Sequence, residues 1–497
     1  MSNGPEHGLA ARTAAGASLL IAQRLITRFI DLGTLFVLGR LLSPGDFGLV
    51  AIAMSLILVV EAILELPLNQ ALVRLPTLTK AHYDTAFTVG LMRGLGLALI
   101  LLVAAWPFAL LYDDSRLAAL VAALAIAPAV RGLSSPRLAE YAKKLDFRRD
   151  FAMELVAKSL AFGISVSFAL MTGSYWSIAI GTIITPLTMV AASYVLAPYR
   201  PALSFKEWHA FAGFLGWASA SQAIGALNWQ MDQLFLGRFV SRVELGNFSM
   251  ASNLAFLPFQ ILFVQIIRPV LSAFALVQHD LKRLAAAYQV ASTSTLAFGI
   301  PVMVGMSIFA EPITRIVLGD QWIGAALALR WISLSIIPAM FVTPAGPLAM
   351  ALNRTRPLFH VALIEFVLRL PLMFVAAAYY GVPGVLAVRM GLAFVVAGCC
   401  MLVVRQLIAL PVRKQILGPW RPILSSIVMA ATVLPFEARF DGTPIDVSWV
   451  GALTATICLG ALAYSVSMLL LWRIAGRPTD CLESKIIELI SSRLQRS

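Results

Sequence analysis

The chain alternates long apolar stretches with short polar ones, and the apolar stretches are long enough to cross a lipid bilayer as helices. A helix rises about 1.5 Å per residue, so about 20 residues cross a hydrocarbon core about 30 Å thick. Stretches of this kind lie at 14–38, 46–68, 84–111, 117–134, 151–172, 174–196, 212–236, 246–268, 288–310, 322–350, 358–380, 382–405, 420–436 and 448–472. The pattern predicts an all-α integral membrane protein with about 14 transmembrane helices.

The polar stretch after the first predicted span is repeated after the seventh. Residues 39–48 read GRLLSPGDFG and residues 237–246 read GRFVSRVELG, 198 residues further on. The flanking hydropathy matches too, which predicts two related multi-helix lobes. We expect two six-helix lobes around a central cavity, with the N-lobe at 1–200 and the C-lobe at 201–410. Two further helices at 411–475 and a cytoplasmic amphipathic tail at 476–497 follow.

Each repeated stretch has the pattern of a helix N-terminus. A serine stands three residues before an acidic side chain, as Ser43 with Asp46 and as Ser241 with Glu244. Serine, aspartate and glutamate cap or stabilise the positive end of a helix. We therefore interpret both stretches as caps of the following spans, not as binding sites.

Composition and charge support a membrane protein. Charged residues make up 13% of the chain, apolar residues 60%, and the mean hydropathy is +0.85. Six arginines are assigned to the interior of the spans. Of the other Lys and Arg residues, 26, including Lys158, are assigned to one set of loops and the two ends, and six to the opposite loops. The positive-inside rule then predicts that both termini are cytoplasmic. Loops facing an anionic leaflet explain the net charge of +13 without nucleic acid.

Polar side chains inside the predicted spans are the candidates for function. Catalytic motifs such as a Gly-rich phosphate loop, His-Glu-x-x-His or Gly-x-Ser-x-Gly are absent from the sequence, so we do not expect an enzyme. Charged groups in a bilayer face the bundle interior or a wet cavity. The predicted cavity cations, for an anionic head group, are Arg24, Arg28, Arg93 and Arg369. Further cavity or coupling residues are Asp31, Glu61, Glu65, Gln222, Trp229, Asp232, Gln233 and Glu365.

Several of these residues have a structural alternative. Glu365 and Arg369 stand at i, i+4, the spacing of a local helix ion pair, and Arg28 and Asp31 allow a similar pair. Arg24 has no evident partner on its own helix, so we expect it to contact the ligand.

The two acids of the second span also have two interpretations. Glu61 and Glu65 are either proton or cation coupling groups or counter-charges to Arg24 and Arg93. We favour the counter-charges.

Three segments resemble one transporter family. Residues 39–50 (GRLLSPGDFGLV) are similar to the loop after the first helix of the polysaccharide-transporter (Wzx-type) flippases, and 145–149 (LDFRR) to the basic segment after their fourth helix. Asp320-Gln321-Trp322 at the start of the tenth span, the span count and the two halves agree with that family.

The resemblance implies a flippase of the multidrug/oligosaccharidyl-lipid/polysaccharide exporter superfamily, located in the inner membrane of a bacterial cell. Such a protein moves an oligosaccharide on undecaprenyl diphosphate to the outer leaflet by alternating access, for exopolysaccharide, capsule or O-antigen synthesis. Its partners would be the lipid-linked oligosaccharide, membrane lipids, and polymerase or export proteins. It needs no cofactor, and the sequence leaves open whether H⁺, Na⁺ or the gradient of the cargo drives transport. The alternatives are a drug or cation antiporter of the same superfamily and a polysaccharide polymerase or ligase.

Overall fold

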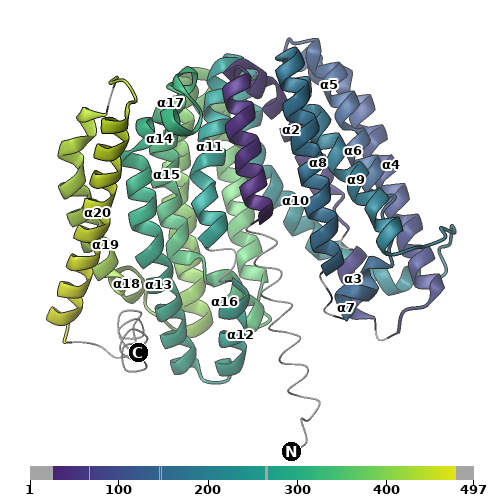
Figure 1. Cartoon of the computed structure of the whole chain (residues 1–497). Helices are drawn as coiled ribbons and strands as arrows, with labels where there is room; N and C mark the ends of the chain where they lie inside the picture. Colours follow the sequence, from purple (N-terminus) through teal and green to yellow (C-terminus); the bar gives the residue numbers. More distant parts are fainter. Residues whose placement is uncertain are drawn as a thin grey trace, which may run out of the picture. The chain divides into compact units, whose positions relative to one another are not determined.

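The chain folds into helices throughout the part that a computed structural model describes. This part comprises residues 26–66, 68–75, 77–144, 146, 148–262, 267–440 and 442–476, without the side chains at 70, 74, 210–222, 262 and 268. Every regular element in these ranges is a helix (Figure 1), which confirms the predicted fold class. The chain divides into two compact units between Ser249 and Met250. Arg24 and the predicted tail from residue 477 onward lie outside the described ranges.

The first unit contains a helical bundle in which α8 and α9 pack along each other and α4 packs on α5 and α6 (Figure 1). In the same unit α10 packs on α2. Its elements are a helix at 26–41, α2 (Pro44–Ile63), α3 (Leu68–Arg74), α4 (Lys80–Leu111), α5 (Arg116–Leu124), α6 (Ile126–Arg131), α7 (Leu138–Lys143), α8 (Arg148–Thr172), α9 (Trp176–Leu196), α10 (Trp208–Phe239) and the first turns of α11 (Arg242–Leu262).

In the second unit α13 packs on α15 and on α19, and α15 packs on α17. The last two long helices, α19 and α20, lie side by side (Figure 1, yellow). After the rest of α11 the elements are α12 (Ile267–Val277), α13 (Leu281–Ile308), α14 (Ala310–Val317), η1 (Asp320–Trp322), α15 (Ala325–Val342), α16 (Ala345–Ala351), α17 (Arg356–Ile408), α18 (Val412–Leu417), α19 (Trp420–Val433), η2 (Leu434–Arg439) and α20 (Val447–Ile474).

Nine helices in the described ranges are long and apolar enough to cross a membrane. The predicted spans 358–380 and 382–405 both fall within α17, which is kinked at Gly381 (φ 58°, ψ −142°), a conformation that favours glycine. On α4, Leu99, Val103 and Trp106 are all more than 60% exposed. Such apolar outer faces are expected of helices that are surrounded by lipid.

Glycines set the close packing of α4 in the first unit. A Cβ atom at Gly94 would lie 2.7 Å from the carbonyl oxygen of Pro128, and one at Gly132 would lie 2.5 Å from the carbonyl oxygen of Gly90. Small residues four apart let helix backbones approach each other in membranes. The Gly90 and Gly94 pair therefore holds α4 against the end of α6.

Candidate functional site

Asp31, on the helix at 26–41, is held by a lysine from α8. Lys158 Nζ donates to both carboxylate oxygens, at 2.5 and 2.6 Å, whereas the Arg28 guanidinium lies 3.8 Å from the same group. The loop assignment of Lys158 was therefore wrong, because this residue lies well inside α8. Two cations share one carboxylate, and the Arg28 side chain remains 44% exposed. This cluster has an excess of one positive charge.

Arg93 on α4 reaches the C-terminal end of α2. Its Nε donates to the carbonyl oxygen of Leu64 at 2.6 Å, and its Nη2 lies 3.4 Å from a Glu65 carboxylate oxygen. The predicted pairing of Glu65 with Arg93 is thus confirmed. Glu61 has a different partner, because its carboxylate accepts 2.7 Å hydrogen bonds from Arg131 at the end of α6.

A hollow of about 560 Å³ opens beside these ion pairs, and we call it the Arg93 hollow. Its charged lining consists of Arg93, Arg131, Glu65 and Asp150. Two cations and two carboxylates leave the lining without net charge. The Arg93 hollow is therefore polar but not selective for an anion.

Two arginines inside helices of the second unit also face carboxylates. Arg369 Nη1 donates to Glu365 at 2.7 Å within α17, which confirms the predicted i, i+4 ion pair. Arg330 on α15 pairs with Glu437 in η2. Each of these two arginines is therefore neutralised by its partner acid.

The predicted polar stripe on α10 has a mixed environment. Asp232 is buried, Gln233 Nε2 lies 3.5 Å from Ser249 Oγ, and Trp229 is 52% exposed. The side chain of Gln222 lies outside the described ranges. The described residues of this stripe therefore differ in exposure, from the buried Asp232 to the exposed Trp229.

The two repeated stretches form the same helix cap. The backbone N–H of Asp46 and that of Glu244 each donate to the serine three residues earlier, both at 3.2 Å. In return, the two carboxylates accept from the backbone N–H groups of Ser43 and Ser241, at 3.1 and 3.0 Å. The first residues of α2 and α11 are 198 residues apart, like the repeat itself. The predicted capping is confirmed in both copies.

The repeated stretches also contact each other, and we call the contact of 39–48 with 237–246 the repeat junction. A Cβ atom at Gly48 would lie 1.9 Å from the carbonyl oxygen of Arg242, and one at Gly246 would lie 1.8 Å from that of Pro44. Each glycine faces the first residue of the other helix, so the contact is reciprocal, as in a two-fold interface. Only glycine fits at these two positions without a backbone shift.

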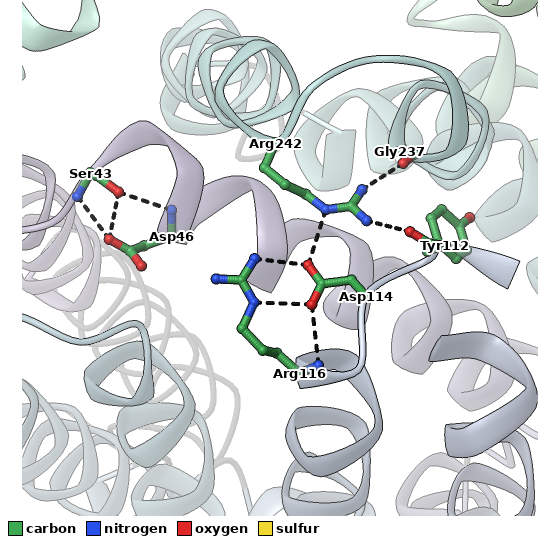
Figure 2. A network of polar contacts seen from close by, with 7 residues as sticks. All are labelled: Ser43, Asp46, Tyr112, Asp114, Arg116, Gly237 and Arg242. Carbon is green, nitrogen blue, oxygen red and sulfur yellow. Dashed lines mark hydrogen bonds and ion pairs between the residues drawn. The ribbon is translucent and has the colours of Figure 1, made fainter. Parts of the chain in front are cut away.

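An arginine of the second copy joins the repeat junction to the end of α4 (Figure 2). Arg242 donates to the backbone oxygens of Gly237 and Tyr112, both at 2.7 Å, and its Nε lies 3.4 Å from Asp114. Arg116 grips the same Asp114 carboxylate at 3.0 and 2.8 Å. Because a guanidinium presents its donors in a fixed planar fork, Arg242 can bind all three groups at once.

The two titratable groups of this network keep the protonation states that it needs. The hydrogen bond from Arg116 holds the pKa of the Asp114 carboxyl below its usual value. Burial raises the pKa of the Tyr112 hydroxyl, which donates to the carbonyl oxygen of Leu234 at 2.8 Å, to about 12. At neutral pH the carboxylate is therefore an acceptor and the hydroxyl a donor.

Sequence reasoning missed the role of Asp113 and Asp114. Asp114 binds Arg242, and Asp113 lies 3.1 Å from Arg238, so both acids pair with the second repeated stretch. The sequence did contain a signal. Asp113 and Asp114 stand in a short loop that belongs to the set of loops with few cations, and Arg238 and Arg242 are two of those cations. Opposite charges on short loops at the same end of a bundle are candidates for pairing.

Comparison with known proteins identifies the family. A sequence profile described as polysaccharide biosynthesis protein matches residues 37–327, more than half of the chain. The chain belongs to this family. The match begins just before the first repeated stretch and includes the second, so the repeat junction lies within the region that defines the family.

Curated members of comparable length are similar along most of the chain. The succinoglycan biosynthesis transport protein ExoT of Rhizobium meliloti (strain 1021) is 25% identical over 446 residues, which are 88% of each chain. The lipopolysaccharide biosynthesis protein WzxC of Escherichia coli (strain K12) is 22% identical over 386 residues, 75% of this chain and 77% of that one. The predicted resemblance to polysaccharide transporters is confirmed.

Two solved structures share the fold of this family member. The lipid II flippase MurJ in an inward closed conformation aligns with a TM-score of 0.73 and 15% identity over 92% of this chain and 100% of that one. A multidrug resistance MATE family transporter of the MOP superfamily, in an inward-facing conformation, aligns with a TM-score of 0.61 and 14% identity over 78% of this chain and 96% of that one. The chain therefore has the fold of a multi-pass membrane transporter.

Proposed function

We propose that the chain is a flippase that moves an oligosaccharide linked to undecaprenyl diphosphate from the inner to the outer leaflet of a bacterial cytoplasmic membrane. It works by alternating access and serves exopolysaccharide, capsule or O-antigen synthesis. The observation that carries the proposal is the similarity, over 88% of both chains, to a protein named as a succinoglycan biosynthesis transport protein. The fold shared with a lipid II flippase supports it. Both termini face the cytoplasm.

The charges of the first unit suit such a cargo. A diphosphate is anionic and cannot cross hydrocarbon unless polar donors replace its water. Arg28 and Lys158 share the single carboxylate of Asp31, so Arg28 is better placed to bind a phosphate oxygen than the other described cavity cations, Arg93 and Arg369. Arg24 stands four residues before Arg28 in the sequence, and we expect its charge to contribute as well.

The other described cavity cations should contribute less to the attraction of the cargo. Arg93 and Arg369 each have a carboxylate partner, Glu65 and Glu365. A guanidinium has five N–H donors, so such a pair still leaves donors for a cargo. Because the partner acid cancels the charge, we expect Arg93 and Arg369 to orient the cargo more than to attract it.

Complementation of a deletion strain tests the proposal. In a strain that lacks the gene, we expect loss of surface polymer and accumulation of lipid-linked oligosaccharide on the cytoplasmic side. Arg28→Ala should lower polymer output about tenfold or more, because a charge-assisted hydrogen bond contributes about 1.5–3 kcal/mol. An Arg24→Ala, Arg28→Ala double variant should abolish it. Polymer output is measured together with the amount of variant in the membrane.

The matched control is Arg354→Ala, which removes an exposed arginine between α16 and α17. It should leave polymer output unchanged. Normal output from a well-expressed Arg24→Ala, Arg28→Ala variant would refute the cavity assignment. A deletion strain that exports polymer normally but becomes sensitive to drugs would refute the flippase and favour a drug antiporter.

A further inference from the structure

A second hollow, of about 590 Å³, lies at the N-terminal end of α4 in the first unit. Its polar lining comes from three segments: the start of α4, the start of α7 and the residues that follow α9. These lining residues are Lys80, Tyr83, Arg137, Glu140, Tyr199 and Arg200. We call it the Arg200 hollow, and we propose that it binds a phosphate group carried by a membrane lipid.

Hydrogen bonds fix the walls of the Arg200 hollow. Arg137 Nη1 donates to the carbonyl oxygen of Pro198 at 2.8 Å, which ties the start of α7 to the segment after α9. The Tyr199 hydroxyl donates to the Asp84 carboxylate at 2.5 Å, and burial raises the pKa of Tyr199, which keeps it a donor. The Tyr199 ring packs against Phe87 with 5.9 Å between centroids. The hollow is therefore preformed.

The charge of the lining favours an anion. Lys80, Arg137 and Arg200 face a single lining carboxylate, Glu140, which leaves an excess of two positive charges. Glu140 is already engaged, since it lies 3.4 Å from Arg137 and 3.5 Å from Lys144. The side chains of Lys80 and Arg200 make no hydrogen bond or ion pair with any residue in the described ranges. Two exposed cations are thus available to a ligand, in contrast to the balanced lining of the Arg93 hollow.

The position of the Arg200 hollow identifies the source of the phosphate as a lipid. Lys80 is the first residue of the span formed by α4, and Arg200 follows four residues after the span formed by α9. Both residues therefore lie where spans meet the headgroup layer. The next segment carries Leu203 and Phe205, which are 73% and 55% exposed, and is tied to α4 by the hydrogen bond from Ser204 N–H to Thr88 Oγ1 at 2.9 Å. Exposed apolar side chains beside cations are typical of a surface in contact with lipid.

The size of the Arg200 hollow fits a phosphorylated headgroup. Small-molecule sites have volumes of about 300–1,000 Å³, and the phosphate is gripped by arginine and lysine donors while an apolar chain stays in the bilayer. The inference does not depend on the cargo of the proposed flippase, because any lipid with an accessible phosphate has the required chemistry. Phosphatidylglycerol is a suitable probe, since phosphatidylcholine carries the same phosphate with a compensating cation.

Native mass spectrometry of the full chain tests this site. The purified protein in detergent is titrated with dioleoyl phosphatidylglycerol, and in parallel with dioleoyl phosphatidylcholine. We expect preferential retention of phosphatidylglycerol. Lys80→Ala and Arg200→Ala should each weaken it about fivefold, and the double variant about 30-fold, from the usual contribution of one cation near an anionic surface. Lys80→Arg should retain the lipid like the natural chain.

The matched control is a Lys282→Ala, Arg354→Ala double variant, which removes one exposed lysine and one exposed arginine away from the hollow. It should bind phosphatidylglycerol like the natural chain. Equal binding by the Lys80→Ala, Arg200→Ala variant would overturn the proposal. Displacement of the lipid by inorganic phosphate at millimolar concentration would show a site for free phosphate and would overturn the lipid assignment. The readout involves no transport, so its failure is distinct from failure of the proposed flippase.

Discussion

The two ends of α4 are built differently. At its C-terminal end, Tyr112 and Asp114 join a network in which Arg242 and Arg116 donate to carbonyl and carboxylate oxygens at 2.7–3.4 Å. At its N-terminal end, Lys80 lies at the Arg200 hollow without a partner among the described residues. Polar groups thus satisfy one another at one end, whereas two cations, Lys80 and Arg200, remain open at the other.

The difference indicates that one end of α4 stabilises the fold and that the other end binds a ligand. At the C-terminal end of α4, the repeat junction joins stretches 198 residues apart. The backbones are in contact at Gly48 and Gly246, where a side chain has no room. Cations without a protein partner, as in the Arg200 hollow, form hydrogen bonds with water. They exchange these for charge-assisted hydrogen bonds when an anion binds. The repeat junction should therefore govern stability, and the Arg200 hollow should govern binding.

The largest effect is expected at the two glycines of the repeat junction. In Gly48→Ala or Gly246→Ala, the added methyl group would lie within 2 Å of a backbone carbonyl oxygen, so α2 and α11 must move apart. Overpacking of this kind costs about 3 kcal/mol or more. The melting midpoint of the purified protein, followed by tryptophan fluorescence, should fall by roughly 5–10 °C.

The control for these glycines is Gly305→Ala on α13, where an added Cβ atom meets no atom within 4 Å. Its melting midpoint should stay the same or rise slightly, because alanine favours a helix over glycine by about 0.5–1 kcal/mol. If Gly48→Ala had the same melting midpoint as this control, the close backbone contact at the repeat junction would be refuted.

A smaller effect is expected from the arginine that joins the repeat junction to α4. Arg242→Gln loses the fork that binds Gly237, Tyr112 and Asp114, and we expect a loss of about 2 kcal/mol of stability. Arg238→Gln is the control, because Arg238 forms an ion pair with the exposed Asp113 and exposed pairs contribute about 0–1 kcal/mol.

A double-mutant cycle sharpens this prediction. The loss of stability in the Asp114→Asn, Arg242→Gln double variant should be about 1 kcal/mol smaller than the sum of the losses in the two single variants. The reason is that both single variants remove the same ion pair. Strictly additive losses would mean that Arg242 acts through the two carbonyl oxygens alone. The measurement is again the melting midpoint of all four proteins.

Local patterns in the sequence predicted the fold and the contacts within one helix, but not the contacts between distant helices. The apolar runs gave the helices, and the spacing of Glu365 and Arg369 gave an ion pair that the structure contains, because both depend on the helical repeat alone. The pairing of Lys158 with Asp31 joins residues 127 positions apart, and that of Arg131 with Glu61 joins residues 70 apart. Such partners are fixed by how helices pack, which periodicity does not specify.

The smallest effect tests whether the two copies of the repeat are equivalent. Ser43→Ala and Ser241→Ala each remove the side-chain oxygen that accepts from the backbone N–H of the acid three residues later. The loss of an N-cap costs about 1 kcal/mol. Because the hydrogen bonds of the two caps match within 0.1 Å for the backbone donors, the melting midpoints of both variants should fall by the same amount, about 2–3 °C. Ser43→Asp and Ser241→Asp, which keep a capping oxygen, should restore the midpoint. A lower melting midpoint for one variant and an unchanged midpoint for the other would show that only one cap stabilises the protein. The two copies would then be similar in sequence but not in their contribution to stability.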